Sequence, residues 1–277
     1  MIPFKKMHGL GNDFVVLDAR KNSIELTSKQ IVAIADRRRG VGFDQILVME
    51  PSGHADFFMK VINSDGTTDT VCGNGTRCVA RLFFEETGKD KVVIDTIGGV
   101  VYAEEAGDLV RVNMGQPRTN WQEMPIAKDV DFKNLKFEEF PELPPAIVAS
   151  VGLPHTVFFI KDAEAVDVAG LGSKLEVHTM FPQRTNVEFC HIVGPHHIRM
   201  RVWERGSGVT EACGSGACSV LVAAVQRGLV KDWAEIQMDG GSLHIEWRKD
   251  DNCVYMTGPA AHAFSGFLDP SLLSTAA

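Results

Sequence analysis

Two of the six cysteines in this sequence stand in the same local pattern. Cys72 opens the run Cys72-Gly-Asn-Gly75 and Cys213 opens the run Cys213-Gly-Ser-Gly216, and each run leads into a segment with helical spacing of apolar residues. Glycine lets the backbone turn sharply, and the first N–H groups of a helix have no partner within the helix. The partial positive charge at that end favours an anion and lowers the pKa of a thiol placed there. The sequence therefore predicts two turns that each stabilise a thiolate and can each bind a carboxylate.

Two such turns acting on one carboxylate would place its α-carbon between two sulfur atoms. One thiolate could take the α-proton while the opposite thiol returns a proton to the other face, which inverts the stereocentre. N–H donors aimed at the carboxylate would stabilise the extra negative charge of the intermediate, and a donor of this kind contributes about 2.7–4 kcal/mol in other enzymes. The scheme needs no pyridoxal phosphate, so we expect no cofactor, although the spacing alone leaves a pyridoxal enzyme open.

The remaining cysteines have no such pattern, and we expect them to be small buried hydrophobic residues; they are Cys78, Cys190, Cys218 and Cys253. A zinc site is a weak alternative, because the gaps from Cys72 to Cys78 and from Cys213 to Cys218 do not suit a zinc knuckle and no histidine pair completes one. A redox dithiol would favour Cys-x-x-Cys, which is absent. We therefore expect no metal site.

The elements that must position the two cysteines are short strands with few helices. Segments rich in β-branched and aromatic residues are 14–18, 45–49, 57–62, 92–94, 100–102, 109–112, 146–148, 156–160, 187–189, 198–203, 235–238, 243–247 and 254–256. Helical spacing covers about 29–37, 75–87 and 216–227, and glycines at 88 and 228 are suited to end the last two. Residues 115–145 hold five of the twelve prolines, so we expect a linker followed by surface loops.

The two halves of the chain are related by a shift of 141 residues. Pairs that match at this shift are Met59/Met200, Lys60/Arg201, Val61/Val202, Cys72/Cys213, Gly73/Gly214, Gly75/Gly216 and Val79/Val220. Asn63 and Glu204 also fall at equivalent places, nine residues before each cysteine. The simplest architecture is two similar α/β domains that face each other across a pseudo-twofold axis. That arrangement would put Cys72 and Cys213 on opposite walls of one cleft.

Length, composition and charge exclude several classes of protein. A chain of 277 residues fits one or two domains, and 44% hydrophobic with 23% charged residues is near the globular average. The net charge of −8 argues against a nucleic-acid partner. No apolar run is long enough to span a membrane, and the N-terminus lacks the apolar stretch of a signal peptide. We expect a cytoplasmic protein with no membrane association.

The motifs together resemble the diaminopimelate epimerases over nearly the whole chain. The segments that carry the resemblance are Met7-His-Gly-Leu-Gly-Asn-Asp-Phe14, Gly42-Phe-Asp-Gln45, Asn63-Ser-Asp-Gly66, Cys72-Gly-Asn-Gly75, Arg184-Thr-Asn-Val187, Trp203-Glu-Arg-Gly206, Ala212-Cys-Gly-Ser-Gly216 and Thr257-Gly-Pro-Ala260. The resemblance implies an isomerase that interconverts LL- and meso-2,6-diaminopimelate without a cofactor, in lysine and peptidoglycan-precursor biosynthesis. It also implies a small amino-acid substrate and a homodimer.

We accordingly expect an α/β (α+β) fold of two pseudo-symmetric domains. Each would be a mostly antiparallel, strand-rich, barrel-like sheet around a central helix, with the active site in the interdomain cleft. The expected domains are 1–117, carrying Cys72 and joined by a C-terminal strand 263–277, and 118–262, carrying Cys213.

The resemblance also implies a role for individual residues. Cys72 and Cys213 would be the two acid/bases, and His155 and Glu204 would tune the thiols. Backbone at Gly73-Asn74 and Gly214-Ser215 would hold the reacting carboxylate. The residues implied to line the substrate pocket are Asn12, Gln45, Asn63, Asn186, Glu204 and Arg205. Arg205 suits a carboxylate bidentately, and Glu204 suits an ammonium group.

One position departs from the family pattern. The family usually has Gly-Asn-Pro-His where this chain has Gly152-Leu-Pro-His155. Leucine cannot donate the hydrogen bond that asparagine would give to the distal end of the substrate, a loss of about 0.5–1.5 kcal/mol. A related racemase of another amino acid that needs no pyridoxal phosphate is therefore an alternative, and a non-catalytic binding, redox or zinc protein is a further one.

Overall fold

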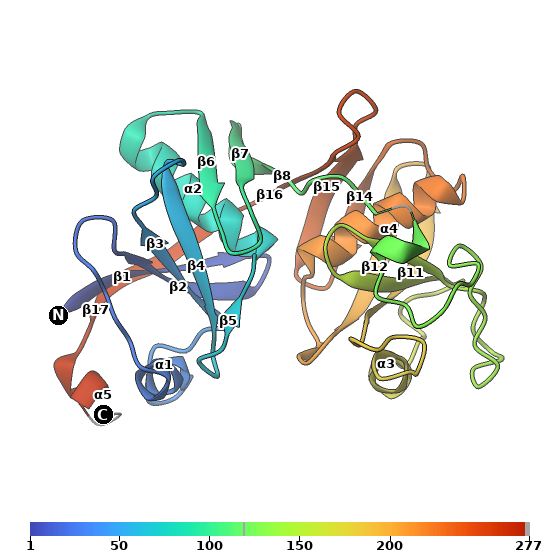
Figure 1. Ribbon diagram of the computed structural model, residues 1–277, viewed down its shortest axis with the longest axis horizontal. Coiled ribbons are helices and arrows are strands. Elements are labelled where there is room, and N and C mark those ends of the chain that lie inside the picture. Colours follow the sequence, from blue (N-terminus) through green and yellow to red (C-terminus); the bar gives the residue numbers. More distant parts are fainter. Residues whose placement is uncertain (119, 275–277) are drawn as a thin grey trace. The chain divides into compact units, whose positions relative to one another are not determined.

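The chain folds into two compact units. The computed structural model describes residues 1–118 and 120–274. Unit 1 comprises Met1–Val112 with Gly258–Ala277, and unit 2 comprises Asn113–Thr257. Each is a mixed α/β unit, rich in strands and with few helices (Figure 1).

Unit 1 is built on one sheet of mostly antiparallel strands. Its elements are β1 (Ile2–Gly9), β2 (Asn12–Asp18), α1 (Ser28–Ala35), β3 (Gln45–Glu50), β4 (Phe57–Asn63), β5 (Thr68–Asp69), α2 (Gly73–Thr87), β6 (Lys91–Asp95), β7 (Val101–Ala106), β8 (Leu109–Asn113), whose last residue already belongs to unit 2, β17 (Ala261–Leu268) and α5 (Pro270–Ser274). The strands pair in the order β17–β1–β2–β3–β4–β6–β7, with β2–β3 and β4–β6 parallel and the others antiparallel. β5 pairs with the other end of β4.

Unit 2 repeats this arrangement. Its elements are η1 (Trp121–Glu123), β9 (Ile147–Ser150), β10 (Pro154–Phe159), α3 (Val168–Glu176), β11 (Asn186–Gly194), β12 (His197–Glu204), β13 (Gly208–Val209), α4 (Gly214–Gln226), β14 (Trp233–Met238), β15 (Gly241–Trp247) and β16 (Val254–Gly258), whose last residue belongs to unit 1. The strands pair in the order β9–β10–β11–β12–β14–β15–β16, with β10–β11 and β12–β14 parallel. β13 pairs with β12 as β5 pairs with β4.

The 141-residue shift holds in the register of the two sheets as well as in the sequence. Phe14 of β2 lies opposite Gln45 of β3, and the shifted pair, His155 opposite Asn186, joins β10 to β11. In the same way Ile46 lies opposite Ile62 in unit 1, and Val187 lies opposite Trp203 in unit 2. Residues related by the shift therefore occupy equivalent places in the two units.

Each sheet is covered by a helix on both faces. Alternate residues of a strand point to opposite faces, and in β3 the side chains of Ile46 and Val48 pack in the cluster with Ile31 and Ile34 of α1. Between them Leu47 points to the other face, where α2 lies against β1, β2, β3, β6 and β7. Unit 2 has the same layers, with α3 on one face of its sheet and α4 on the other (Figure 1).

Glycine and capping residues set the ends of these helices. Thr27 and Gln30 form a reciprocal capping box at the start of α1. α2 ends at Gly88, whose φ of 69° is in the left-handed region that favours glycine. α4 begins two residues earlier than the predicted helix, at Gly214, because Cys213 is its N-cap.

Two expectations about single segments of the chain are wrong. Residues 115–145 are not only linker and surface loop, because Met124, Ile126, Leu135 and Phe137 are buried in the core cluster of unit 2. Apolar side chains in a segment without regular structure can still be buried, and proline content does not reveal this. A C-terminal strand was expected over 263–277, but β17 ends at Leu268. Asp269 follows, and α5 begins at Pro270, a residue suited to the first position of a helix. Residues 275–277 lie outside the described residues.

Of the described elements, six were not predicted at all: β1, β5, η1, α3, β13 and α5. The two longest are β1, which begins the chain, and α3, which lies between β10 and β11. Shifting α1 by 141 residues would have predicted a helix at 169–176, which α3 covers. Among the described residues, no helix combines the length and the apolar character that crossing a membrane requires.

Candidate active site

Cys72 is the N-cap of α2, the helix that covers one face of the sheet of unit 1. Its backbone is extended, with φ −134° and ψ 109°, and its Sγ accepts a hydrogen bond from the N–H of Gly75 at 3.3 Å. The side chain is partly exposed. A Cβ on Gly75 would lie 2.9 Å from Cδ2 of Leu47. Glycine is needed here because the start of α2 approaches β3 closely.

A chain of side-chain amides connects the predicted pocket residues near Cys72. Asn74 Nδ2 donates to Asn12 Oδ1 at 3.2 Å, and Asn12 Nδ2 donates to Asp44 Oδ2 at 2.8 Å. Arg77 Nη1 donates to Asn74 Oδ1 at 3.0 Å, so the orientation of each amide group follows from the next one in the chain. The structure thus brings Asn12 and Asn74 together at the start of α2.

The other two predicted pocket residues of unit 1 pair across neighbouring strands. Gln45 lies opposite Asn63 in the β3–β4 ladder, and its Nε2 donates to Asn63 Oδ1 at 2.9 Å. Asn63 Nδ2 in turn donates to Thr67 Oγ1 at 3.1 Å. Gln45 directly follows Asp44, which accepts a hydrogen bond from Asn12. The backbone therefore connects the Gln45–Asn63 pair to the hydrogen bonds that join Asn12 and Asn74.

A cluster of four charged residues anchors the loops that carry these amides. The ammonium group of Lys6, which is 8% exposed, donates to Asp13 and to the carbonyl of Gly42. Arg37 donates to both oxygens of Asp13, at 3.0 and 2.8 Å, and to Asp44 at 2.7 Å. Burial opposes ionisation of Asp13, but the hydrogen bonds and charges of Arg37 and Lys6 outweigh it and lower the pKa of Asp13 to about 2. The cluster holds the turn before Gln45 against the start of β2.

Cys213 has the same local geometry in unit 2. It is the N-cap of α4 with φ −127° and ψ 108°, and its Sγ accepts a hydrogen bond from the N–H of Gly216 at 3.4 Å. The Oγ of Ser215 lies 3.6 Å from the same sulfur atom, and the N–H of Cys213 donates to Sδ of Met238 at 3.4 Å. The two predicted turns therefore exist, and each presents a thiol at a helix N-terminus.

The expectation that this turn lowers the pKa of Cys213 is wrong. The residue is 4% exposed, and burial raises the pKa of its thiol well above the usual range. The carboxyl groups of Glu204 and Glu188 raise it further, and the hydrogen bonds from Ser215 and the Gly216 N–H are too weak to reverse the effect. Cys213 is therefore held as a protonated thiol in this structure.

The two residues expected to tune the thiols lie in unit 2. His155 Nδ1 is 2.6 Å from Glu188 Oε1, and both side chains are fully buried. Glu204 accepts a hydrogen bond from Thr210 and interacts with the thiol of Cys213. Burial raises the pKa values of Glu188 and Glu204, while His155 opposes the shift in both. His155 and Glu204 thus share one buried cluster with Cys213 and Glu188.

Asn186 and Arg205 lie next to each other at the ends of β11 and β12. Asn186 Nδ2 donates to the carbonyl of Pro154 at 3.2 Å, and its Oδ1 accepts from the N–H of Arg205 at 2.9 Å. The guanidinium group of Arg205 donates to the carbonyl of Gln183 at 3.0 Å. Leu153, the position that departs from the family pattern, is 40% exposed in the turn before β10.

Sequence reasoning missed several residues of these two sites. Glu188 is a charged residue inside an apolar strand, and Arg77 is fully buried in α2; a charge in an apolar segment was the signal in both cases. Nothing in the sequence pointed to Thr210.

The prediction for Cys78, Cys190 and Cys218 is confirmed, since all three are buried, but Cys253 is only partly buried. It lies in the turn before β16, where Asp251 fixes its backbone N–H.

Within residues 1–118 and 120–274, no group of three or more His, Cys, Asp or Glu side chains is placed to hold a metal ion.

Comparisons with known proteins agree over nearly the whole chain. A family model described as diaminopimelate epimerase matches residues 4–120 and 147–263. The diaminopimelate epimerase of Rhodospirillum centenum is 50% identical over 273 residues, covering 98% of this chain and 93% of that protein. That of Acidiphilium cryptum is 48% identical, with 98% of each chain covered. A solved structure of a phenazine biosynthesis protein of the PhzF family from Enterococcus faecalis has a TM-score of 0.71 at 14% identity and covers 96% of this chain and 98% of its own, a likeness of fold.

Proposed function

Because the chain belongs to the diaminopimelate epimerase family, we propose that it interconverts LL- and meso-2,6-diaminopimelate in lysine and peptidoglycan-precursor biosynthesis. The observation that carries the proposal is the equivalence of Cys72 and Cys213. Each is the N-cap of the helix that covers its sheet, with nearly the same φ and ψ and the same hydrogen bond from the glycine N–H three residues on.

The reaction removes a proton from one face of a single carbon and adds a proton to the opposite face. The substrate carboxylate binds the N–H groups at Gly73-Asn74 and Gly214-Ser215, where helix N-termini favour negative charge. The sulfur of one cysteine, as thiolate, forms an S–H bond as the α-C–H bond breaks, and the electron pair passes into the carboxylate. The S–H bond of the other cysteine then breaks as a new C–H bond forms on the opposite face. No electron is gained or lost, so the scheme needs no redox partner.

The two thiols begin the reaction in different roles. The raised pKa of Cys213 suits a thiol that donates a proton, which leaves Cys72 to remove one when the matching epimer is bound. After one turnover the roles are exchanged, and the reverse reaction begins from that state. Before the next turnover in the same direction, Cys72 loses its proton to solvent and Cys213 takes one up. The nearby carboxyl group of Glu204 favours this because it raises the pKa of the Cys213 thiol.

The remaining polar residues bind the substrate away from the reacting carbon. Arg205 and Asn186 suit the distal carboxylate, because a guanidinium group pairs with it bidentately. Glu204 suits an ammonium group. Asn12, Gln45 and Asn63 offer amide donors and acceptors whose orientation is already set by their hydrogen bonds to one another and to Asp44.

The experiment combines a substrate panel with deuterated water. LL-diaminopimelate, L-proline, L-glutamate and L-lysine are incubated with the protein, and loss of optical purity is followed for each. We expect turnover of diaminopimelate, with one deuterium at the inverted carbon of the product. Turnover of another amino acid in its place would assign the protein to a different racemase activity, and turnover without deuterium would exclude proton transfer.

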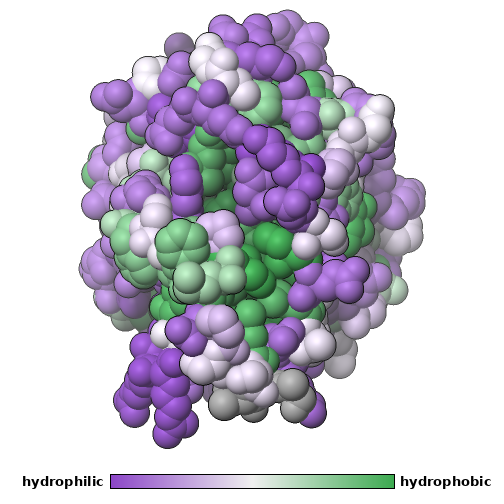
Figure 2. All heavy atoms as spheres, turned by 90° about the vertical axis from the view of Figure 1, so that its left-hand side faces the viewer, coloured by the Kyte–Doolittle hydropathy of each residue, from purple (hydrophilic) through white to green (hydrophobic). Residues whose placement is uncertain are grey.

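The site is proposed to act in the cytoplasm, where a reducing environment keeps both cysteines as thiols. The protein is further proposed to act as a homodimer that uses an apolar face of unit 1. Figure 2 shows apolar side chains gathered at the centre of that face, with hydrophilic ones around them. Phe264 and Phe267 of β17 are 49% and 65% exposed. Large exposed apolar groups of this kind mark interaction surfaces, and a twofold axis would bring the same patch of a second copy against them.

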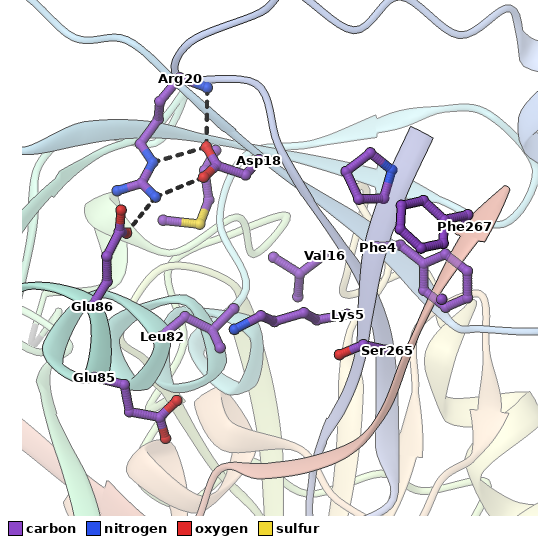
Figure 3. Close-up of a pocket in the computed structure, with 13 residues that line it drawn as sticks. Phe4, Lys5, Val16, Asp18, Arg20, Leu82, Glu85, Glu86, Ser265 and Phe267 are labelled. Atoms are coloured by element: carbon purple, nitrogen blue, oxygen red, sulfur yellow. Dashed lines mark hydrogen bonds and ion pairs between the residues drawn. The ribbon is translucent and has the colours of Figure 1, made fainter. Parts of the chain in front are cut away.

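Beside these phenylalanines lies a pocket of about 580 Å³ that a side chain of the second copy could enter. Phe4, Val16 and Leu82 form part of its apolar lining, and Arg20 bridges Asp18 and Glu86 at one side (Figure 3). Sedimentation equilibrium should give twice the chain mass for the wild type and one chain mass for Phe267→Asp. Tyr102→Asp, at a residue of β7 that is 56% exposed, is the control and should remain dimeric. A monomeric wild type would refute the dimer and leave the catalytic proposal intact.

A further inference from the structure

The two halves of the repeat differ at one pair of buried residues beside the cysteine-bearing helices. His155 and Glu188 in unit 2 occupy the places that Phe14 and Leu47 occupy in unit 1. Leu47 packs against Gly75 of α2, and Glu188 packs against Gly216 of α4, where its Oε1 would lie 3.0 Å from a Cβ. The same Cβ would lie 3.2 Å from Sγ of Cys213. Cys213 therefore has an ionisable pair beside it where Cys72 has two apolar side chains.

The pair is buried and only half of its hydrogen-bonding atoms are satisfied. His155 Nδ1 and Glu188 Oε1 are 2.6 Å apart, and both side chains are 0% exposed. In the part of the chain that the structure describes, His155 Nε2 and Glu188 Oε2 have no hydrogen-bond partner. An unpartnered polar atom in a protein interior is costly, so its presence points to a ligand or a reacting group that completes it.

Charge neutrality determines where the proton of this pair lies. A net charge is expensive to bury, so the stable form of the pair carries none. The 2.6 Å separation is shorter than an ordinary bond from a neutral N–H to a neutral oxygen, which disfavours a neutral ring donating from Nδ1 to a carboxylic acid. The pair is then either imidazolium with carboxylate, or neutral imidazole that accepts a hydrogen bond from the carboxylic acid at Nδ1. In both forms Nε2 carries a hydrogen atom, because a neutral ring that accepts at Nδ1 has its hydrogen on Nε2.

We propose that Glu188 is a positioning residue that keeps a proton on Nε2 of His155 and so makes this N–H a fixed donor to negative charge in the reaction centre of unit 2. The inference rests on the proposed function for its role in catalysis. With leucine in place of Glu188, no side chain would fix the orientation of the His155 ring or determine which of its nitrogen atoms carries the proton. Burial also raises the pKa of Glu188, as expected for a carboxyl group that shares its proton with a neighbour.

Other ionisable groups face the pair and share its environment. Cys213 at the start of α4 and Glu204 at the end of β12 both interact with Glu188, and Cys190 on β11 interacts with it from the same strand. Arg199 on β12 acts on Cys190. We expect that removing the carboxyl group of Glu188 alters the protonation of His155 directly. Any change in the protonation of Cys213, Glu204 or Cys190 would follow from that.

The test reads the proton directly and does not depend on catalysis. The protein is labelled with ¹⁵N-histidine, and long-range ¹H–¹⁵N spectra report which nitrogen of His155 is protonated, with the signal assigned by its loss in His155→Phe. We expect a protonated Nε2 at pH 7 in the wild type. In Glu188→Gln the amide oxygen is uncharged and can accept a hydrogen bond from Nδ1–H. The ring is then expected to be neutral with its single hydrogen on Nδ1, so Nε2 loses its proton. A bare Nε2 in the wild type, or the same spectrum in both proteins, would overturn the proposal.

Kinetics provide the second measurement. With Glu188→Gln we expect kcat to fall about 100-fold, which is typical of the loss of one fixed hydrogen-bond donor, while KM stays within about twofold. We also expect the basic limb of the pH profile of kcat to move to lower pH. Glu235→Gln, the same change at an exposed residue of β14, should leave kcat and its pH profile unchanged. Wild-type kcat and pH profile in Glu188→Gln would contradict the proposal. If the wild type itself epimerises nothing, the proposed function fails and the NMR result still decides the tautomer.

A double variant separates the positioning role from a structural one. His155→Phe with Glu188→Leu installs in unit 2 the apolar pair that unit 1 already holds at the same register. We expect it to fold with a Tm close to the wild type and to lose kcat at least as much as Glu188→Gln. A fully active double variant would show that the pair serves packing alone.

Discussion

Glu188 stands in unit 2 where Leu47 stands in unit 1, and each side chain touches the second glycine of a Cys-Gly-x-Gly turn. The repeat therefore preserves the helix start and the cysteine but gives the two thiols different neighbours. A carboxyl group close to Cys213 raises the pKa of that thiol in addition to the effect of burial. This difference between two cysteines with the same backbone geometry fits the opposite starting roles that the proposed mechanism gives them.

Replacing either cysteine with alanine should abolish epimerisation. Loss of a positioned acid or base costs about 10²–10⁴ in rate, and the proposed mechanism assigns each proton-transfer step to one thiol. Cys72→Ala and Cys213→Ala are assayed by optical rotation and by deuterium content of the product. Cys253→Ala, at a partly buried thiol in the turn before β16, is the control and should keep wild-type activity. Near-normal turnover in either of the first two variants would disprove the two-thiol mechanism.

The two thiols should differ in their reaction with iodoacetamide in the absence of substrate. Alkylation requires both access and the thiolate, and Cys213 is 4% exposed with a raised pKa, whereas Cys72 is partly exposed. At pH 7.5 we expect Cys72 to be labelled about tenfold faster or more, as measured by peptide mass spectrometry over time. Raising the pH to 9.5 should increase labelling of Cys213. Equal rates at pH 7.5 would contradict the assignment of Cys213 as the protonated thiol.

The charged cluster around Asp13 should contribute stability that depends on pH. The pKa of Asp13 is about 2 in the folded protein and 3.8 in the unfolded chain. A lowered pKa stabilises the fold above the unfolded value, so about 2 kcal/mol is present at pH 5–7 and is lost as the pH falls from about 4 to 2. Urea unfolding of the wild type and Asp13→Asn should therefore differ most at neutral pH and converge toward pH 2. A difference that stays constant down to pH 2 would contradict this.

Gly172→Ala should destabilise unit 2 and disturb the end of β12, which carries Glu204. An added Cβ would lie 2.4 Å from Cβ and 2.6 Å from Cγ of Trp203, so α3 and β12 would have to separate. We expect a loss of about 1–3 kcal/mol, despite the better helix propensity of alanine, together with a lower kcat/KM. Gly53→Ala, where an added Cβ meets no atom within 4 Å, is the control for chemical unfolding and kinetics. Equal stability of the two variants would contradict the packing argument.

Leu153→Asn should strengthen substrate binding. The residue is 40% exposed in the turn that leads to His155, where the family usually has asparagine. An added hydrogen bond of about 0.5–1.5 kcal/mol corresponds to a two- to tenfold lower KM for diaminopimelate with kcat unchanged. Leu153→Ala should not lower KM. An unchanged KM in Leu153→Asn would show that the turn does not contact the substrate.

Much of the fold and both helix starts could be predicted because they depend on local rules. Glycines and apolar spacing identified α1, α2 and α4, and the 141-residue repeat identified the duplication that the sheet registers display. α3 was missed although the repeat encodes it. The core residues between 121 and 143 were missed because loops that pack have no periodicity to reveal them.

The sequence by itself determined that two cysteines end up as N-caps of equivalent helices, because the residues that make such a turn are neighbours in the chain. Only the tertiary structure decided the chemistry of each thiol. Burial and the approach of Glu188 and Glu204 raise the pKa of Cys213 against the effect of its own helix. That balance depends on residues brought together from β11, β12 and α4, and desolvation and distance are properties of the packed protein rather than of any segment of the chain.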